Sequence, residues 1–224
     1  VGEQVEGIEG RNGQVVAVST DKDRYAADLV LLATGLEPGA ELARLAGIAI
    51  GRSGAIAIND RMKADVVGIW AAGDCIEVKH VVTGEPVYAP LALTANRTGR
   101  IAGDNVGAQS AGKTSSQRFR GTAGTLIAKV FGFTAAQTGL TLLEVERAGF
   151  SASVFTRQSR TLASYYPGAE SLWSRIVVDR TTRRLLGAQV LSREGVAGRI
   201  DVFATALFNR MSIDEIYDLD LAYA

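Results

Sequence analysis

Few side chains in this chain are of the kinds that usually perform chemistry. Its 224 residues include one cysteine, Cys75, and one histidine, His80. A single cysteine cannot form an internal disulfide, and these two side chains cannot supply the four ligands of a structural zinc site. A Ser–His–Asp arrangement could use only His80, and the pattern G-x-S-x-G does not occur. We therefore expect no metal site and no hydrolase chemistry, and the lone cysteine fits a reducing, cytoplasmic compartment.

One phosphate-binding pattern is present letter for letter. Residues 107–114 (GAQSAGKT) fit G-x-x-x-x-G-K-[ST]. A working phosphate loop follows a strand and opens a helix, whose amides then face the phosphates. In this chain the preceding residues favour a helix, and the following ones lead toward Gly121. A flexible linker is the favoured interpretation, and nucleoside triphosphate binding is kept as a weaker hypothesis. Asn96-Arg97-Thr98 fits the glycosylation pattern but lies in a predicted helix.

The charge balance excludes further classes of protein. Lys plus Arg and Asp plus Glu both number 24, which gives a formal net charge of zero. Nucleic-acid-binding domains usually carry a basic face, so no nucleic-acid partner is expected. No apolar run approaches the ~20 residues that cross a bilayer, so no membrane partner is expected either. The chain opens at Val1 without a methionine and closes at Ala224 without a polar tail, which indicates a part of a longer protein.

Two apolar runs have the character of strands that are buried on both faces. Residues 28–33 (DLVLLA) end at Thr34-Gly35, and residues 66–72 (VVGIWAA) end at Gly73-Asp74. Such runs are typical of parallel sheets with helices on both sides. Ligands of these sheets lie beyond the carboxyl ends of the strands, where glycine permits a close approach. A tight turn with a capping aspartate is the alternative interpretation of each motif.

Patterning predicts the remaining elements. A helix is expected over 91–106, a linker over 107–118, and an antiparallel α+β region after it. Ser212 and Glu215 have the spacing of a capping box that starts a short final helix. The other predicted segments are two strands within 3–18, strands at 125–130, 152–156, 173–178 and 185–191, a turn at 180–183, short helical signals over 134–149 broken at Gly139, and an amphipathic helix at 195–210.

These motifs, taken together, resemble one family. The segments ATGLEP (33–38), WAAGDCIE (70–77) and PLALTANRTGR (90–100) occur in the order found in pyridine nucleotide–disulfide oxidoreductases. Within that family the chain looks most like the coenzyme A-disulfide reductase and NADH oxidase group. Later segments continue the likeness to the end of the chain: FRGT (119–122), GLT (139–141), YYPG (165–168), LGAQ (186–189), GRIDV (198–202) and DLAYA (220–224).

The resemblance implies an FAD site and an NAD(P)H partner. In the family, the aspartate matching Asp74 bonds the ribityl chain of FAD, and Gly73 precedes it. The segment matching Pro90, Leu91 and Ala92 lies beside the flavin ring, and Gly35 matches a glycine that ends the nicotinamide domain. The pattern G-x-G-x-x-G is absent, so the usual pyrophosphate cradles are not expected within this chain.

The resemblance also implies a homodimer that acts on coenzyme A or a small disulfide. Tyrosines matching Tyr165, Tyr166 and Tyr223 reach the bound coenzyme A across the subunit interface, although packing at a sheet edge is an alternative for the first two. The reactive cysteine of the family lies upstream, so Cys75 is not expected to be the redox thiol. His80 is expected to be structural, and no catalytic residue is expected in this chain.

The expected fold is α/β: an incomplete Rossmann-like FAD/NAD(P)-binding region, then an α+β dimerisation domain with an antiparallel sheet. Residues 1–60 would be the tail of the NAD(P)-binding domain, 61–118 the returning half of the FAD-binding domain, and 119–224 the dimerisation domain. The favoured function is part of an FAD-dependent NAD(P)H oxidoreductase that reduces coenzyme A disulfide through an upstream cysteine, with a chain inactive by itself. NADH oxidase or peroxidase activity and a non-catalytic dimerisation fragment are the alternatives.

Overall fold

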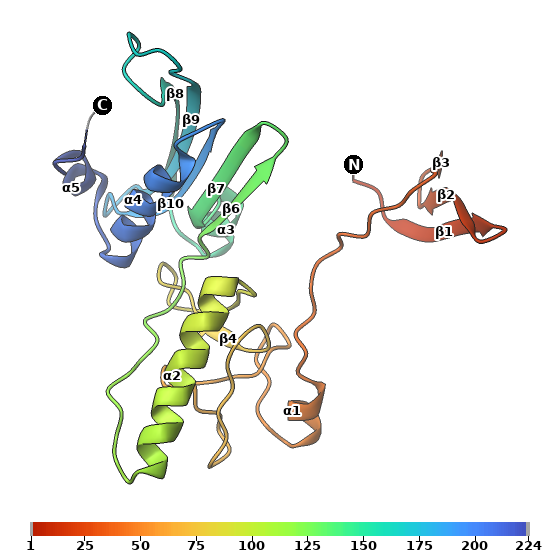
Figure 1. The fold of residues 1–224 in the computed structure, drawn as a ribbon, viewed down its shortest axis with the longest axis vertical. Helices are drawn as coiled ribbons and strands as arrows, with labels where there is room; N and C mark the ends of the chain where they lie inside the picture. Colours follow the sequence, from red (N-terminus) through yellow and green to blue (C-terminus); the bar gives the residue numbers. More distant parts are fainter. Residues whose placement is uncertain (1, 223–224) are drawn as a thin grey trace. The chain divides into compact units, whose positions relative to one another are not determined.

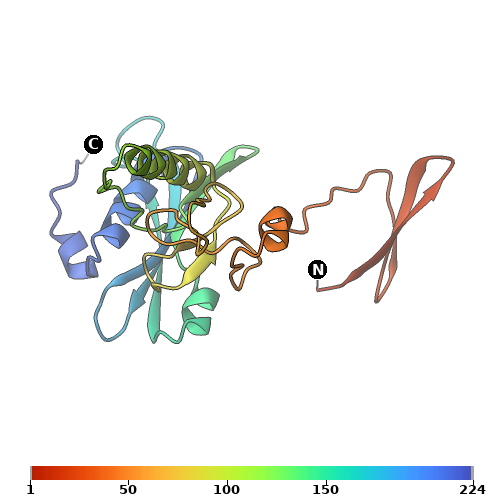
Figure 2. The same ribbon diagram turned by 90° about the horizontal axis from the view of Figure 1, so that it is seen from below.

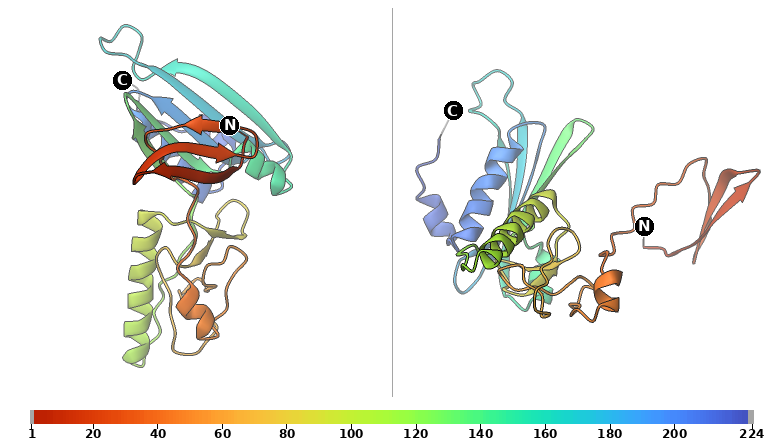
Figure 3. Two further views of the ribbon diagram at one scale, coloured as in Figure 1. Left: turned by 90° about the vertical axis from the view of Figure 1, so that its right-hand side faces the viewer. Right: turned by 60° about the horizontal axis from the view of Figure 1, so that its bottom comes forward.

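The computed structural model describes residues 2–222, and the chain divides into two compact units between Glu37 and Pro38. The first unit contains an antiparallel sheet of β1 (Val5–Arg11), β2 (Gln14–Thr20) and β3 (Arg24–Ala26) (Figure 3). Asn12 and Gly13 join β1 to β2, and both have positive φ, as a two-residue hairpin turn requires. The two strands expected within residues 3–18 are therefore confirmed, and β3 is an addition.

The strand predicted over residues 28–33 does not form. Residues 27–40 contain neither helix nor strand, and Leu29 and Leu31 are 80% and 83% exposed. The run at 66–72 is also not a strand, since Trp70 makes only an isolated bridge with Lys63. Both predictions were wrong for one reason: a strand buried on two faces needs hydrogen-bonded neighbours and covering helices. Within residues 2–222 no parallel sheet supplies them.

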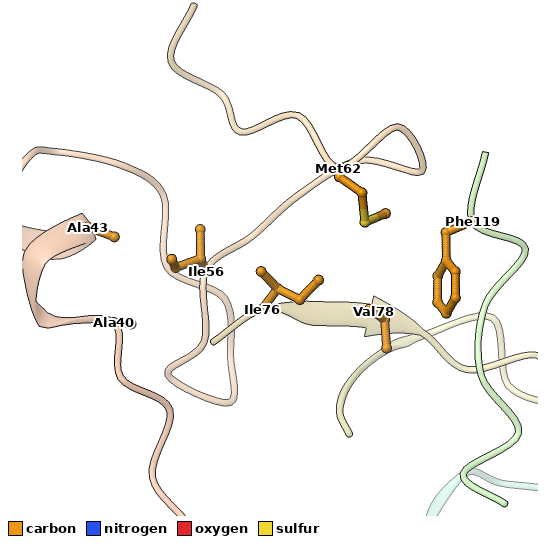
Figure 4. Packing of buried hydrophobic residues seen from close by; sticks show 7 residues of the cluster. All are labelled: Ala40, Ala43, Ile56, Met62, Ile76, Val78 and Phe119. Carbon is orange, nitrogen blue, oxygen red and sulfur yellow. The ribbon is translucent and has the colours of Figure 1, made fainter. Parts of the chain in front are cut away.

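The second unit begins with a small core built mostly from loops. Its regular elements are α1 (Glu41–Leu45), the hairpin of β4 (Glu77–Lys79) and β5 (Pro86–Tyr88), and the long helix α2 (Ala92–Ser110). Figure 4 shows the side chains that fill this core, including Met62 between Ile76 and Phe119. The complete buried cluster is Ala40, Ala43, Ile56, Met62, Ile76, Val78 and Phe119.

The helix expected over residues 91–106 is confirmed, and it continues into the segment expected to be a linker. After Ser110 the chain has no helix or strand until β6 (Leu126–Val130). The backbone N–H of Lys113 donates to Ala108 O (2.8 Å), which closes the end of α2. The sequence GAQSAGKT thus terminates a helix and opens none, so it lacks the strand–loop–helix geometry of a phosphate loop. Phe119 then packs into the core described above.

A five-stranded antiparallel sheet forms the rest of the unit, in the order β6-β7-β10-β9-β8. Its other strands are β7 (Phe133–Gly139), β8 (Ala152–Arg160), β9 (Ser171–Asp179) and β10 (Leu185–Ser192). α4 (Val196–Phe208) lies along one face, where Val196 and Ile200 pack against Ala188 and Val190 (Figure 1). The antiparallel α+β region, its strands and this helix are confirmed.

Two short helices begin near the end of the sheet at which β7 finishes and β10 starts. α3 (Leu142–Arg147) lies at the end reached by β7, and α5 (Ile213–Tyr217) follows α4 (Figure 2). The capping box predicted at Ser212 is confirmed, because Glu215 N donates to Ser212 Oγ (3.2 Å) and Ser212 N to Glu215 Oε2 (2.7 Å). The helical signals expected before Gly139 were wrong. Residues 134–139 belong to β7, because β6 and β10 offer hydrogen-bonding edges on both sides.

Candidate functional site

The turn at Gly73–Asp74 is held by the middle of α2. Gly73 has φ +89°, a left-handed conformation that suits glycine, and a Cβ added there would meet nothing within 4 Å. Its backbone N–H donates to Thr98 Oγ1 (3.2 Å), and the Thr98 side chain is completely buried. Asp74 itself is exposed. The turn therefore leaves the Gly73 backbone unobstructed and the Asp74 carboxylate exposed, while the hydrogen bond to Thr98 holds it against α2.

Three buried hydroxyls continue from this turn toward the sheet. Thr98 Oγ1 donates to Thr94 O (2.8 Å), one turn earlier in α2. Thr94 Oγ1 donates to Thr122 Oγ1 (3.4 Å), and Thr122 lies in the segment that leads into β6. Sequence reasoning assigned no role to these threonines. The signal that could have found them is the four-residue spacing of Thr94 and Thr98, which places both hydroxyls on one face of a helix.

The amino end of α2 is open to an acceptor. Leu91 is the N-cap residue, and it has no side chain that could accept from the helix amides. The first turn contains no acidic side chain, and Ala92 at its start is exposed. Uncapped amides and the helix dipole both favour negative charge at such an end. Pro90 and Leu91 are partly buried, so part of each side chain remains available to pack against a ligand that is bound at this helix end.

An open cleft of about 670 Å³ borders this helix end. The β4–β5 hairpin forms one wall, and the end of β7 together with α3 forms the other. His80 lies at its base, where it is 7% exposed and accepts from Val82 N through Nδ1 (3.3 Å). Burial lowers the pKa of His80, and nearby Glu144 opposes that effect. The imidazole is therefore buried and hydrogen-bonded, and the structural role of His80 stays a prediction.

Two side chains that follow Asp74 have structural contacts. The Cys75 thiol is partly buried and donates to Ala72 O (3.4 Å), inside the same turn. The Glu77 carboxylate is 6% exposed and accepts from Ser53 N (2.7 Å). A Cβ on Gly51 would collide with that carboxylate. Glu77 thus fixes residues 51–55 against β4, and it was missed because an isolated glutamate has no sequence signal for burial.

Tyr165 and Tyr166 lie at the other end of the sheet from the cleft. They are in the β8–β9 connection, exposed, with ring centroids 5.5 Å apart. The cleft is lined by Gly139 and Leu140, where β7 ends. β8 alone has 9 residues, a length of roughly 30 Å at the usual rise per residue. Within one chain these tyrosines are therefore far from Pro90 and Leu91.

The structure does not bring every predicted site residue together. Gly73 and Asp74 share one region with Pro90, Leu91 and Ala92, because α2 supports both segments. Gly35 has φ +112° and lies in the other compact unit. Tyr223 lies outside the described residues. In the part of the chain that is described, no group of three or more His, Cys, Asp or Glu side chains could hold a metal ion.

Comparison with known proteins identifies the family. The family model described as pyridine nucleotide-disulphide oxidoreductase matches residues 1–99, and the model of that family's dimerisation domain matches residues 126–224. The chain belongs to the pyridine nucleotide-disulphide oxidoreductase family. Its mixed α/β fold with an antiparallel sheet is the fold expected from the sequence, and the resemblance stated from the motifs is confirmed.

Two curated relatives show how much of a known protein this chain matches. A protein named NAD(P)H sulfur oxidoreductase (CoA-dependent), from Pyrococcus abyssi, is 41% identical over 97% of this chain and 47% of its own length. A coenzyme A disulfide reductase from Staphylococcus aureus is 30% identical over 98% of this chain and 48% of its own. The chain spans about half the length of these curated relatives.

A solved structure shows the same architecture. The NAD-dependent persulfide reductase from A. fulgidus superimposes with a TM-score of 0.92 at 37% sequence identity. The match covers 99% of this chain and 40% of the other. The helices described between residues 2 and 222 include none long and apolar enough to span a membrane.

Proposed function

We propose that this chain supplies the returning half of an FAD site and the dimerisation domain of an NAD(P)H-dependent disulfide reductase. The observation that carries the proposal is the hydrogen bond from Gly73 N to Thr98 Oγ1, which holds the Gly73–Asp74 turn against α2. The favoured substrate is coenzyme A disulfide or a related disulfide or persulfide, in line with the names of the relatives. The three domains 1–60, 61–118 and 119–224 are part of the same proposal.

The residues of this chain fit one side of a flavin nucleotide. Asp74 would accept hydrogen bonds from the hydroxyls of the ribityl chain, because its carboxylate is exposed beside an unobstructed glycine. Pro90, Leu91 and Ala92 would flank the ring, and the uncapped amides of α2 would stabilise negative charge at its pyrimidine edge. The bound FAD would pass electrons from NAD(P)H to the disulfide. In the overall reaction NAD(P)H and one proton convert one disulfide into two thiols and NAD(P)⁺.

The tyrosines proposed to bind the substrate would act at the site of the second subunit of a dimer. Tyr165 and Tyr166 lie at the end of the sheet away from Pro90 and Leu91, so within one subunit they cannot meet a flavin held there. In a homodimer formed through residues 119–224, these tyrosines and Tyr223 would contact coenzyme A in the partner's site. The thiol that exchanges with the disulfide would lie outside this chain, because Cys75 is engaged inside the Gly73–Asp74 turn.

Flavin binding tests the proposal directly. The purified chain, and the chain mixed with a polypeptide that carries the family's upstream nucleotide-binding half, are titrated with FAD and followed by absorbance and fluorescence quenching. We expect the mixture to bind FAD, and Asp74→Ala to weaken binding by about 10-fold, because a charged hydrogen-bond acceptor contributes ~1.5–3 kcal/mol. Asp65→Ala, at another exposed acidic position, is the control. Equal FAD affinity of Asp74→Ala and the native sequence would contradict the assignment.

Two other functions remain as outcomes of the same experiment. A non-catalytic dimerisation module is supported by the match of residues 126–224 to the family's dimerisation domain and by the absence of G-x-G-x-x-G from this sequence. A colourless dimer that binds no FAD, either as the purified chain or in the mixture, would establish this function. NADH oxidase or peroxidase activity would appear as consumption of oxygen or peroxide in place of the disulfide. We place the protein in the cytoplasm with no nucleic-acid or membrane partner, which its single cysteine and balanced charge support.

A further inference from the structure

One hydrogen bond joins the Gly73–Asp74 turn to another segment of the described chain. The backbone on either side is fixed to the core, since Ala71 N donates to a core carbonyl (3.1 Å) and Cys75 O accepts from a core amide (2.8 Å). Within the turn, Gly73 N donates to Thr98 Oγ1 (3.2 Å), whereas the Cys75 thiol donates to a carbonyl of the same turn. The position of the turn therefore depends on the Thr98 hydroxyl.

The Thr98 hydroxyl is held by contacts of its own. Its Oγ1 donates to Thr94 O (2.8 Å), which leaves an oxygen lone pair for the Gly73 amide. One turn earlier in α2, Thr94 Oγ1 donates to Thr122 Oγ1 (3.4 Å), and Thr122 N donates to Lys79 O (2.9 Å) in β4. All three threonine side chains are buried. The helix face that carries Thr98 is thus tied to β4 as well as to the turn.

A hydroxyl at position 98 is not required to fill space. The Thr98 side chain is completely buried, and valine has the same shape without a polar group to desolvate. A threonine hydroxyl inside a helix also competes for the backbone carbonyl one turn earlier, which tends to bend the helix. These costs are offset where the oxygen has a second partner. The Gly73 amide is that partner.

The two parts of the proposed flavin site lie at different heights along α2. The helix begins at Ala92, and Thr98 lies about 9 Å further along its axis at the usual rise per residue. The amino end would face the flavin ring, and Asp74 would meet the ribityl chain beside Thr98. The separation of these two contacts is therefore set by a helix, which is rigid, and by one hydrogen bond, which a substitution can remove.

We propose that Thr98 is a positioning residue of the FAD site, which holds the Asp74 carboxylate where the ribityl hydroxyls reach it. The inference rests on the proposed function, in which Asp74 binds that chain. Thr98 is buried and would not touch the flavin, so it acts on affinity through Asp74. A carboxylate on a fixed turn loses less conformational entropy on binding than one on a free turn. Loss of the Thr98 hydroxyl should therefore weaken FAD binding while the carboxylate is still present.

FAD titration of the chain mixed with the family's upstream nucleotide-binding half tests this inference. Thr98→Val should raise the FAD dissociation constant about fivefold, as loss of one hydrogen bond does. Thr98→Ser keeps the acceptor and should bind FAD nearly as tightly as the native sequence. Thr138→Val is the control, because Thr138 is equally buried and its hydroxyl bonds to Thr125 (2.7 Å) and not to the Gly73–Asp74 turn. It should lower stability without changing FAD affinity.

A double-mutant cycle separates positioning from a general loss of stability. Thr98→Val should not weaken FAD binding further when Asp74→Ala is already present, because the carboxylate that Thr98 positions is gone. Thr98→Ala removes the same acceptor and takes the place of Thr98→Val in the cycle if circular dichroism shows that Thr98→Val is unfolded.

Four results would overturn the inference: unchanged FAD affinity in Thr98→Val, no recovery in Thr98→Ser, an equal loss in Thr138→Val, or an effect of Thr98→Val that adds fully to that of Asp74→Ala. In each case weaker binding by Asp74→Ala would leave the proposed function standing. A native mixture that binds no FAD would overturn the proposed function as well.

Discussion

At the scale of single residues, Thr98 is the side chain on which the Gly73–Asp74 turn depends. Its hydroxyl accepts from Gly73 N and donates to Thr94 O. Thr98→Val keeps the volume but removes the acceptor, so it should lower the free energy of unfolding by about 1–3 kcal/mol. Thr98→Ser keeps the hydroxyl and should cost less. Urea denaturation of both variants measures the difference, and equal stabilities would show that the hydroxyl does not support the turn.

Gly187 occupies a position that has no room for a side chain. A Cβ there would collide with the backbone oxygen of Leu140, which cannot rotate away. Gly187→Ala should therefore destabilise the sheet by about 1–3 kcal/mol or more. Gly103 is the matched control, because it lies inside α2 with nothing within 4 Å of an added Cβ. Gly103→Ala should raise stability by about 0.5–1 kcal/mol. Thermal unfolding of the two variants should show opposite shifts.

At the scale of elements, two capping boxes define where the short helices begin. Thr141 Oγ1 accepts from Glu144 N at the start of α3, and Ser212 Oγ accepts from Glu215 N at the start of α5. Thr141→Ala and Ser212→Ala should each cost about 0.5–2 kcal/mol. The two helices are in different clusters of the core, so the losses should add in the double variant. A clearly non-additive double variant would indicate that α3 and α5 are coupled.

The elements also explain which patterns could be interpreted without a structure. Alternation of apolar and polar residues indicated β8, β9 and β10, because one face of each strand packs on α4 or α3. β7 was misassigned in part, since Thr134 to Thr138 has no strong preference and its pairing with β6 and β10 decides its conformation. β4 and β5, with 3 residues each, are too short to produce a detectable period.

At the scale of the whole unit, His80 connects the core around α2 to the five-stranded sheet. It forms a parallel bridge with Thr122, and Val81 N donates to Thr122 O (2.9 Å). Burial lowers its pKa below the ordinary value of 6.5, while Glu144 acts in the opposite direction. Glu85 and Arg147 also line the cleft beside it. The folded state therefore favours the neutral imidazole.

This shift has a defined consequence for stability against pH. Above pH 6.5 the imidazole is neutral in both states, so its contribution is fully present. As the pH falls below 6.5, the unfolded chain binds a proton first, and stability declines until the folded pKa is passed. His80→Gln should reduce this decline in denaturation curves measured from pH 7.5 to 5. The carboxylates of Asp179 and Glu215 have lowered pKa values and affect stability only at more acidic pH. Their effect on the free energy of unfolding can therefore be separated from that of His80.

Several features were determined by the sequence alone. The order of ATGLEP, WAAGDCIE and PLALTANRTGR indicated the family, and the family models that match residues 1–99 and 126–224 confirm it. The capping box at Ser212 was readable because its two hydrogen bonds join residues 3 apart. The antiparallel region was readable because a half-buried strand alternates with period two.

Only the tertiary structure decided the features that depend on distant neighbours. The runs 28–33 and 66–72 have the composition of buried strands but remain irregular, because strand formation requires a hydrogen-bonded partner that the described residues do not provide. The support of Gly73 by Thr98 joins residues 25 positions apart. The separation of Tyr165 from the amino end of α2 follows from the strand order, which local patterns do not encode. These contacts, rather than the motifs themselves, place the Gly73–Asp74 turn against α2 and the loop of Tyr165 and Tyr166 at the far end of the five-stranded sheet.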